Sequence, residues 1–353
     1  MKTLSLVMIT KNEESKLKRC LNSINDLVDE IIIVDTGSTD KTKIIASEFN
    51  ARIFDYKWDN NFSNARNFAI NKSTSDWNLI LDADEFITDI NRYELNKIIN
   101  SNDKFIGQIK IINLFEQEGE IRKSNSFISR LAPKGIYFNG SIHEQLDNTI
   151  SRKIIPIEVE HDGYLNTNKF DRNISLIINE LKENRNDSYL LYQAAKTYYN
   201  NKMYNEAELY FEEFYKNINI EKDAFINDSI ILYLYTIIKT KNFEKGLKII
   251  NENFDILSKS CDFYFVCGLF FTELVASNTE NYLSYFNNIE LCYINALQIG
   301  NSNEIVEGTG SYLAAYNLGI FYELIDNIDK AQYYYKISSN YNYKLAKDKL
   351  NLY

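Results

Sequence analysis

The sequence predicts an α/β domain with a mostly parallel, Rossmann-like sheet, followed by an all-α region of helical hairpins. Three observations support this prediction. Up to about residue 81, β-branched runs alternate with helical patterns, which is typical of a parallel sheet covered by helices. From about residue 170 onward, the apolar residues keep a helical period. The 353 residues include only 2 Pro and 12 Gly, which argues against a loop-rich all-β fold.

The elements of the first region follow from their residue patterns. Helices are expected at residues 15–24, 42–49 and 63–72. Strands are expected at residues 4–9, 30–34, 52–54 and 77–81. From residue 105 the helical period is lost, and further strands of mixed direction are expected around residues 109–112, 127–128 and 154–160.

The helical region repeats one spacing: a small residue, an aromatic three positions later, a small residue nine after that and a bulky residue four beyond. The matching sets are Ala195, Tyr198, Ala207 and Phe211; Gly319, Tyr322, Ala331 and Tyr335; and, less well, Leu234, Ile237, Gly246 and Ile250. Gly268 and Phe271 begin a further unit, with its second helix around residues 292–297. This is the tetratricopeptide spacing, in which small residues let two helices approach closely. A generic helical bundle is the alternative.

These patterns predict three segments. Residues 1–165 form the α/β domain, residues 166–187 a linker helix, and residues 188–353 the helical repeat domain. Repeats of this kind form a concave surface suited to an extended polypeptide, and they can also pair two subunits as a homodimer.

Composition excludes several classes. Acidic residues outnumber basic ones by 49 to 39, for a formal charge of −10, so nothing favours a nucleic acid as partner. No apolar run approaches the ~20 residues of a membrane helix, so no membrane span is expected. The four cysteines form no C-x-x-C pair, so we expect neither a thiolate metal site nor a disulfide framework, and a cytoplasmic chain with free thiols.

The most specific motif is Asp82-Ala83-Asp84, directly after the apolar run 77–81. In open α/β sheets, ligands bind at the carboxyl ends of the strands. Two carboxylates one residue apart in a strand-end turn can face one hard cation, Mg²⁺ or Mn²⁺, which can also hold a substrate diphosphate. The alternative is an exposed acidic turn that merely ends the strand.

Two other strand ends carry polar motifs. Asp35 ends the run 30–34, and its carboxylate could accept a hydrogen bond from uracil N3–H or from ribose hydroxyls. Thr10 and Glu13, in the motif Thr10-Lys11-Asn12-Glu13-Glu14, could add polar contacts to a nucleoside.

Four more residues have two readings each. Arg66 could meet a base or phosphate, or form a surface ion pair. His161 ends the strand 154–160 and could complete a metal shell begun by Asp84, although a lone His is more often structural. Glu144 follows a glycine turn at an expected helix start, where it could be a cap or a base; His143 precedes it.

These motifs together resemble family 2 glycosyltransferases of the GT-A fold. The resemblance rests on residues 5–14, 34–40, 65–67 and 81–85, in the family's order and spacing. The segments 142–145 and 161–164, followed by tetratricopeptide-like hairpins, resemble a bacterial subgroup that includes the sublancin-type peptide S-glycosyltransferases. Two positions depart from the family pattern: Lys11 stands where many members stack an aromatic residue on the base, and Thr36 replaces a second acidic residue.

The resemblance implies an inverting hexose transfer from a UDP-sugar to a Cys, Ser or Thr side chain of a peptide or protein. By motif position, Thr10, Asn12, Glu13 and Asp35 would bind the nucleotide-sugar, with Arg66 nearby. Asp82 and Asp84 would hold Mg²⁺ or Mn²⁺ and the diphosphate, with His161 as a third metal ligand. Glu144 is the expected catalytic base, with His143 as the competitor.

Two alternatives stay open. The acceptor could be a lipopolysaccharide or capsule saccharide, although such enzymes usually need membrane affinity and the chain has no evident basic amphipathic helix. The chain could instead be a repeat scaffold whose N-terminal domain has lost activity; the intact Asp82/Asp84 pair and Asp35 count against this.

Overall fold

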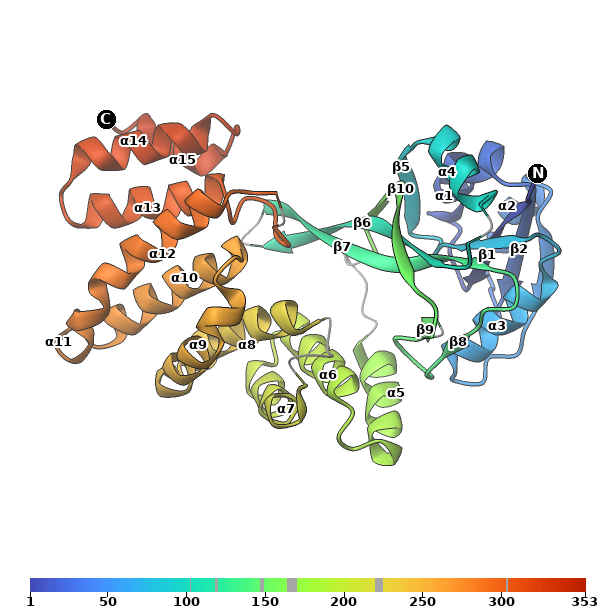
Figure 1. Cartoon of the computed structure of the whole chain (residues 1–353), viewed down its shortest axis with the longest axis horizontal. Coiled ribbons are helices and arrows are strands. Elements are labelled where there is room, and N and C mark those ends of the chain that lie inside the picture. Colours follow the sequence, from blue (N-terminus) through green and yellow to red (C-terminus); the bar gives the residue numbers. More distant parts are fainter. Residues whose placement is uncertain (102, 118–119, 147–148, 164–169, 220–224, 303) are drawn as a thin grey trace. The chain divides into compact units, whose positions relative to one another are not determined.

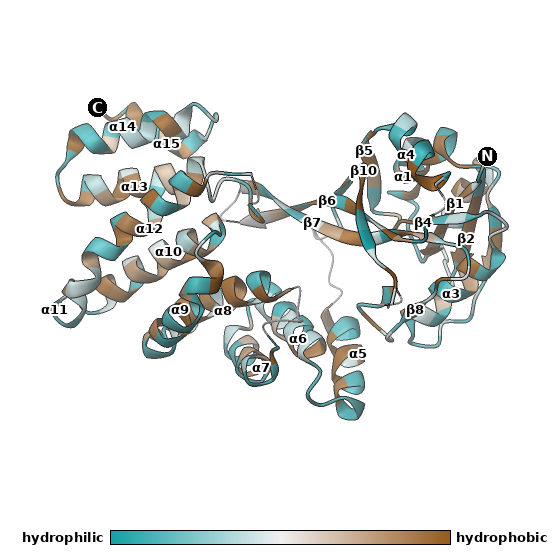
Figure 2. Cartoon of the chain, viewed as in Figure 1, coloured by the Kyte–Doolittle hydropathy of each residue, from teal (hydrophilic) through white to brown (hydrophobic). Residues whose placement is uncertain are grey.

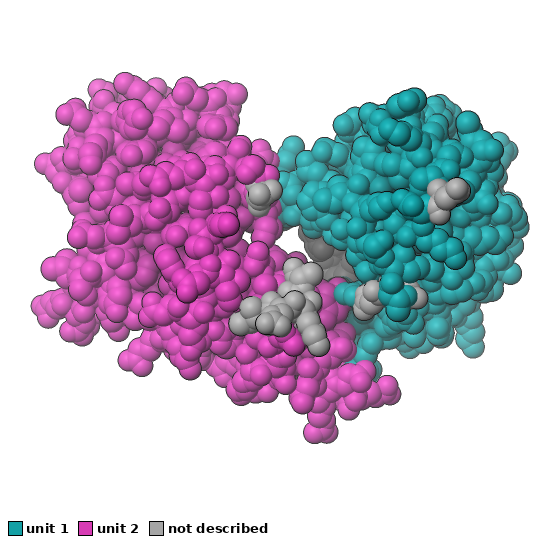
Figure 3. Space-filling model, viewed as in Figure 1, with its two compact units in different colours: residues 1–180 teal, residues 181–353 magenta. Residues whose placement is uncertain are grey.

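The computed structural model describes the chain except for residues 102, 118–119, 147–148, 164–169, 220–224 and 303, and for the side chains of residues 116, 117 and 120. It contains two compact units, Met1–Glu180 and Leu181–Tyr353 (Figure 3). The division at residues 165 and 187 stays a prediction. The beginning of the expected linker helix, residues 166–169, lies outside the described residues, as does residue 164 of the last motif.

Unit 1 is built around one mixed sheet (Figure 1). Among the described residues, eight strands form it in the order β3-β2-β1-β4-β7-β6-β10-β5. These strands are β1 (Leu4–Thr10), β2 (Glu30–Asp35), β3 (Arg52–Asp55), β4 (Trp77–Ile80), β5 (Glu85–Ile90), β6 (Ile106–Gln117), β7 (Glu120–Pro133) and β10 (Arg152–His161). The neighbours among β3, β2, β1 and β4 pair in parallel, and so do β6 and β10. Strand β7 pairs antiparallel with both β4 and β6, and β5 pairs antiparallel with β10. The predicted mostly parallel α/β fold is therefore confirmed.

Helices cover both faces of this sheet because successive strand residues point to opposite sides. Leu6 and Met8 of β1 pack in one core with Leu21 of α1, whereas Val7 packs in a second core with Ile70 of α3. The helices of the unit are α1 (Leu17–Ile24), α2 (Thr42–Glu48), α3 (Phe62–Lys72), α4 (Arg92–Ile99) and α5 (Phe170–Glu183), the last of which continues into unit 2.

The structure corrects the prediction of a helix start at Glu144. Glu144 instead precedes the two-residue strand β9 (Gln145–Leu146), which pairs with β8 (Phe138–Asn139). Gly140 and His143 both have positive φ, +95° and +51°, and this turns the chain back on itself before a helical turn can form. The structure also adds β5 and α4, where short apolar runs are interrupted by charged residues.

Unit 2 is all helical over the residues that the structure describes. Its helices are α6 (Ser188–Asn200), α7 (Tyr204–Asn217), α8 (Ile226–Thr240), α9 (Phe243–Leu257), α10 (Cys261–Ser277), α11 (Thr279–Tyr282), α12 (Phe286–Ile299), α13 (Tyr312–Leu324), α14 (Ile328–Ser339) and α15 (Lys344–Leu350). The pairs α6/α7, α8/α9, α10/α12 and α13/α14 pack as hairpins. Figure 2 shows apolar and polar residues side by side on these helices, as expected for hairpins that bury one face.

The small residues of the predicted repeat let the two helices of a hairpin approach closely, as expected. A Cβ atom on Gly319 of α13 would lie 2.6 Å from the ring of Tyr335 on α14. A Cβ atom on Gly268 of α10 would lie 2.6 Å from Tyr293 on α12. Only a glycine lets these rings approach so closely, and the tetratricopeptide-like prediction is confirmed.

All four cysteines of the chain are free and buried. They are Cys20 in unit 1 and Cys261, Cys267 and Cys292 in unit 2. None of the described helices has both the length and the apolar character that a membrane span needs.

Candidate active site

The predicted site residues gather at one edge of the sheet. The strands β1, β2, β4, β6 and β10 all run in the same direction, so their carboxyl ends share that edge. Thr10 and Asp35 are the last residues of β1 and β2 and are partners in the strand register. Asp82 and Asp84 follow β4, and His161 ends β10. Ligands of open α/β sheets bind outside this edge.

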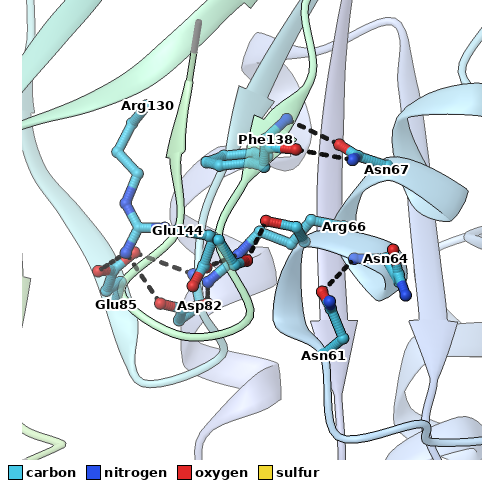
Figure 4. A network of polar contacts seen from close by, with 11 residues as sticks. Asn61, Asn64, Arg66, Asn67, Asp82, Glu85, Arg130, Phe138 and Glu144 are labelled. Carbon is cyan, nitrogen blue, oxygen red and sulfur yellow. Dashed lines mark hydrogen bonds and ion pairs between the residues drawn. The ribbon is translucent and has the colours of Figure 1, made fainter. Parts of the chain in front are cut away.

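An arginine–carboxylate network lies at the centre of the site (Figure 4). Arg66 of α3 donates from Nη2 to Asp82 Oδ1 at 2.8 Å and from Nε to Glu144. Arg130 of β7 donates from Nη2 to Asp82 Oδ2 at 2.8 Å and to Glu85 Oε1 at 2.6 Å. Both carboxylate oxygens of Asp82 therefore accept from an arginine. We call these five residues the arginine–carboxylate network.

Burial makes the charges of this network interdependent. The side chains of Arg66 and Arg130 are 7% and 10% exposed, whereas that of Asp82 is 33% exposed and forms the open end of the network. Burial by itself would raise the pKa of Asp82, but Arg66 and Arg130 outweigh it and hold this pKa well below its usual range. Burial also raises the pKa of Glu85, and Arg130 offsets only part of that effect. Removing either arginine would leave a buried carboxylate unpaired.

The loop that carries His143 and Glu144 is fastened to helices on two sides. Asn67 of α3 donates to the carbonyl oxygen of Phe138 at 2.9 Å and accepts from its N–H at 2.8 Å. The backbone N–H of Ser141 donates to Glu180 of α5 at 3.0 Å. These bonds hold Glu144 against Arg66. The ion pairs of Arg66 are buried rather than on the surface, and its contact with a base or phosphate stays a prediction.

Thr10 and Asp35 are buried at the strand edge with polar atoms that have no partner. Asp35 is 1% exposed, and its Oδ1 accepts from the N–H groups of Gly37 and Ser38 at 3.0 and 2.8 Å. Its Oδ2 and the hydroxyl of Thr10 make no hydrogen bond among the described residues. Buried polar atoms are nearly always paired, so this pair marks a place where a ligand could supply the missing partners.

The other two predicted nucleotide-binding residues have structural contacts. Asn12, with φ +57°, accepts at Oδ1 from the N–H of Thr39 at 2.8 Å, which ties the loop after β1 to the loop after β2. The N–H of Glu13 donates to Thr42 at 2.7 Å. Burial lowers the pKa of Arg172 on α5, and the nearby Glu13 carboxylate opposes that shift. Arg172 also lies 5.3 Å from the centre of the Phe62 ring.

Asp84 and His161 face each other across Gly163. His161 Nε2 lies 3.7 Å from Asp84 Oδ2. Burial would lower the pKa of His161, but the neighbouring Asp84 carboxylate outweighs it and raises this pKa. A Cβ atom on Gly163 would lie 2.1 Å from Asp84 Oδ2 and 2.4 Å from His161 Nε2, so the positions of these two side chains depend on a glycine. The described residues contain no cluster of three or more carboxylate, His or Cys side chains ready for a metal.

These contacts divide the predicted metal ligands. Asp84 and His161 come together, and a carboxylate oxygen with an imidazole nitrogen is a donor set that fits Mn²⁺ or Mg²⁺. Asp82 faces the arginines instead. The residues present therefore fit a metal at Asp84 and His161 better than at the predicted pair Asp82 and Asp84.

The sequence alone assigned no role to Arg130 or Glu85, although Glu85 belongs to the motif of residues 81–85. Arg130 stands in a strand beside Leu131 and Ala132, both fully buried. A charge in such a run is a signal, because a buried arginine needs carboxylate partners. Glu85 adjoins the Asp82-Ala83-Asp84 motif and carries the same signal, since it precedes an apolar pair in β5.

Comparison with known proteins finds a family model that is similar to unit 1. Residues 5–154 match the model of the family described as glycosyl transferase family 2. The part of the chain that matches is most of unit 1, and this match agrees with the resemblance seen in the sequence.

Individual relatives match parts of the chain. The SPbeta prophage-derived glycosyltransferase SunS of Bacillus subtilis is 33% identical over 169 residues, which is 46% of this chain and 40% of the relative. A TPR repeat-containing protein of Synechococcus elongatus is 51% identical over 85 residues, 24% of this chain and 21% of the relative. The chain thus spans less than half the length of these curated relatives.

A solved structure also aligns with part of the chain. Glucosyl-3-phosphoglycerate synthase from Mycobacterium tuberculosis, in complex with Mn²⁺ and UDP, is 22% identical over 31% of this chain and 44% of its own, with a TM-score of 0.27.

Proposed function

We propose that this chain is an inverting glycosyltransferase that moves a hexose from a UDP-sugar to a Cys, Ser or Thr side chain of a peptide or protein. The observation that carries the proposal is the pair of unpartnered buried oxygen atoms on Thr10 and Asp35, at the ligand-binding edge of a family 2 domain. Asp35 Oδ2 can accept from uracil N3–H or a ribose hydroxyl, and the Thr10 hydroxyl can donate or accept. The hexose is of the glucose or N-acetylglucosamine type.

A divalent cation, Mg²⁺ or Mn²⁺, is part of this proposal. Asp84 and His161 would hold it, and the lack of a side chain on Gly163 lets these two groups lie close together. When bound, such a cation neutralises the charge that grows on a departing diphosphate. We assign Asp82 to a different task, which is to hold Arg66 and Arg130 in place at the open end of the network.

Glu144 is the residue proposed to take the proton of the acceptor. Its carboxylate is 11% exposed and paired with Arg66, in a loop fastened by Asn67 and Glu180. This support fixes the position of the carboxylate, as a general base requires. His143, one residue earlier, is the competing candidate. A thiol acceptor, with a pKa of about 8.5, needs less help from a base than a Ser hydroxyl does.

The peptide acceptor rests on two features outside the sheet. One is the similarity to the glycosyltransferase SunS. The other is the tetratricopeptide-like unit, because hairpin repeats offer a long concave surface for an extended polypeptide. Pairing of two chains through this unit stays a prediction. A saccharide acceptor is the alternative, and no observation on the described residues favours it.

The test is a donor and acceptor screen of the full chain. UDP release is measured with several UDP-hexoses, with Mn²⁺, Mg²⁺ or EDTA, and with peptides that contain Cys, Ser or neither. We expect release that requires a divalent cation and rises with a Cys or Ser peptide, together with a hexose mass shift on that peptide. Glu144→Gln is expected to slow transfer to Ser more than transfer to Cys. Absence of UDP binding by calorimetry would contradict the proposal.

A further inference from the structure

Asn113 is a second partner of His161 and fixes the orientation of its imidazole ring. Asn113 of β6 and His161 of β10 are directly paired in the parallel strand register. Asn113 Oδ1 lies 2.9 Å from His161 Nδ1. The other ring nitrogen, Nε2, faces Asp84 Oδ2 at 3.7 Å. The imidazole therefore lies between an amide on one side and a carboxylate on the other.

The amide of Asn113 is itself held in one orientation. Its Nδ2 group donates to Ser126 Oγ on β7 at 3.1 Å and points to the carbonyl oxygen of Ser124 at 3.5 Å. Because the NH₂ group is used on the β7 side, the oxygen of the amide must face β10. An amide oxygen only accepts hydrogen bonds, so His161 Nδ1 carries the hydrogen.

This arrangement leaves the lone pair of neutral His161 on Nε2, the atom that faces Asp84. Metal-binding histidines need such a second partner, because the bond at one ring nitrogen sets the tautomer and the direction of the other. Gly163 lets both atoms lie close to the backbone here, since any side chain at this position would collide with Nε2 and with Asp84 Oδ2. Three strands and a glycine thus prepare one nitrogen and one oxygen for a common ligand.

We propose that Asn113 is a positioning residue, which fixes His161 in its Nδ1–H tautomer so that Nε2 and Asp84 bind one divalent cation. This proposal rests on the proposed function for the cation, but not for the sugar or the acceptor. Asn113 contacts neither substrate nor cation in this role. Ser126 is the residue that orients Asn113.

The first measurement reads the tautomer without any metal. The chain has only 2 His, so a long-range ¹H–¹⁵N spectrum of ¹⁵N-histidine-labelled protein contains two imidazole patterns. A His143→Gln sample assigns them. At a pH where the imidazole is neutral, we expect His161 to show a hydrogen on Nδ1 and a bare Nε2. A hydrogen on Nε2 in the wild type would overturn the proposal, whatever the enzyme does.

The second measurement is the affinity for Mn²⁺ alone, by electron paramagnetic resonance. Asn113→Leu keeps the approximate size and removes the acceptor, so we expect loss of the tautomer preference and a fall in affinity of about 10- to 100-fold. Asn113→Asp keeps an accepting oxygen and should retain both. Ser126→Ala, which frees the amide to turn, should give an intermediate loss. Gln108→Leu, the same kind of change elsewhere on β6, is the control for folding.

The outcomes separate the two proposals. Wild-type affinity for Mn²⁺ in a folded Asn113→Leu would remove Asn113 from the metal site and leave the glycosyltransferase proposal intact. If Asn113→Leu does not fold, Ser126→Ala and Asn113→Asp decide, and equal tautomer mixtures in both would overturn the inference. A wild type that binds UDP but no Mn²⁺ would overturn the cation role of Asn113 and His161 alone.

Discussion

Two parts of the sheet edge differ in whether their buried polar side-chain atoms have partners. In the arginine–carboxylate network every carboxylate has an arginine partner. At the ends of β1 and β2, Thr10 Oγ1 and Asp35 Oδ2 are buried with none among the described residues. The paired half holds the fold in place, because loss of one charge exposes the desolvation cost of the others. These two oxygen atoms add no hydrogen bond to the fold and are available to a ligand, whereas Asp35 Oδ1 is held by Gly37, Ser38 and Lys43.

The largest effect should come from breaking the paired half. Arg130→Met removes the arginine partner of Glu85 and one of the two arginine partners of Asp82, and we expect a loss of about 3–5 kcal/mol in the free energy of unfolding. Urea unfolding followed by circular dichroism measures it. Arg52→Met is the matched control, because Arg52 is half exposed and its ion pair with Glu30 is partly open; its cost should stay within about 1 kcal/mol. Equal losses in the two variants would contradict the comparison.

Acid should weaken the paired half selectively. Asp82 has a folded pKa below its unfolded value of about 3.9. Its contribution is therefore present above that pH and lost as the pH falls toward the folded pKa. We expect wild-type stability to fall more steeply than that of Asp82→Asn between pH of about 5 and 2. Glu85, whose pKa is raised, has the opposite dependence and is present in both proteins. Parallel pH profiles would show that Asp82 is not held ionised by the arginines.

Asp35→Asn tests the unpaired half. Asparagine keeps the oxygen that accepts from Gly37 and Ser38, so we expect stability within about 1 kcal/mol of wild type. Loss of a charged acceptor should weaken UDP binding by about 1.5–3 kcal/mol, roughly 10- to 150-fold. Calorimetry with UDP measures the affinity, and urea unfolding supplies the control. A variant that is strongly destabilised yet binds UDP normally would reverse the roles of the two halves.

The smallest effect is expected for Thr10→Val. The change removes one neutral hydroxyl whose oxygen has no hydrogen-bond partner among the residues that the structure describes, so the free energy of unfolding should change by less than about 0.5 kcal/mol or improve slightly. UDP binding should weaken by about 0.5–1.5 kcal/mol if the hydroxyl bonds to the ligand. The calorimetric titration used for Asp35→Asn gives the answer, and unchanged affinity would limit the nucleotide contact to Asp35.

The same contrast explains how much of the site the sequence could predict. Thr10 and Asp35 end apolar runs, so the period of the strands is enough to place them together at one edge. The spacing of Gly319 and Tyr335 likewise foretells their contact, because it lies within one hairpin. The network is different: Arg130 reaches Asp82 across 48 residues of sequence. That contact depends on the pairing of β7 with β4. The local period of apolar residues does not predict the order of strands in a mixed sheet.

The assignment of Glu144 to a helix failed for a related reason. A glycine turn followed by polar residues is compatible with a helix start or with a tight hairpin. His143 decides between them by adopting a positive φ, a conformation that is uncommon for a non-glycine residue and that local sequence does not predict. The bonds from Asn67 and Glu180 provide that constraint, and both lie far away in sequence.

The burial of the four cysteines has a consequence for a chain proposed to glycosylate thiols. Burial raises the pKa of Cys261 to about 11 and that of Cys292 to about 12, and burial raises the pKa of Cys20 and Cys267 as well. Sugar transfer to sulfur proceeds through an accessible, readily ionised thiol. The chain would thus be a poor acceptor for its own reaction, because the packing around its cysteines keeps them away from the donor sugar.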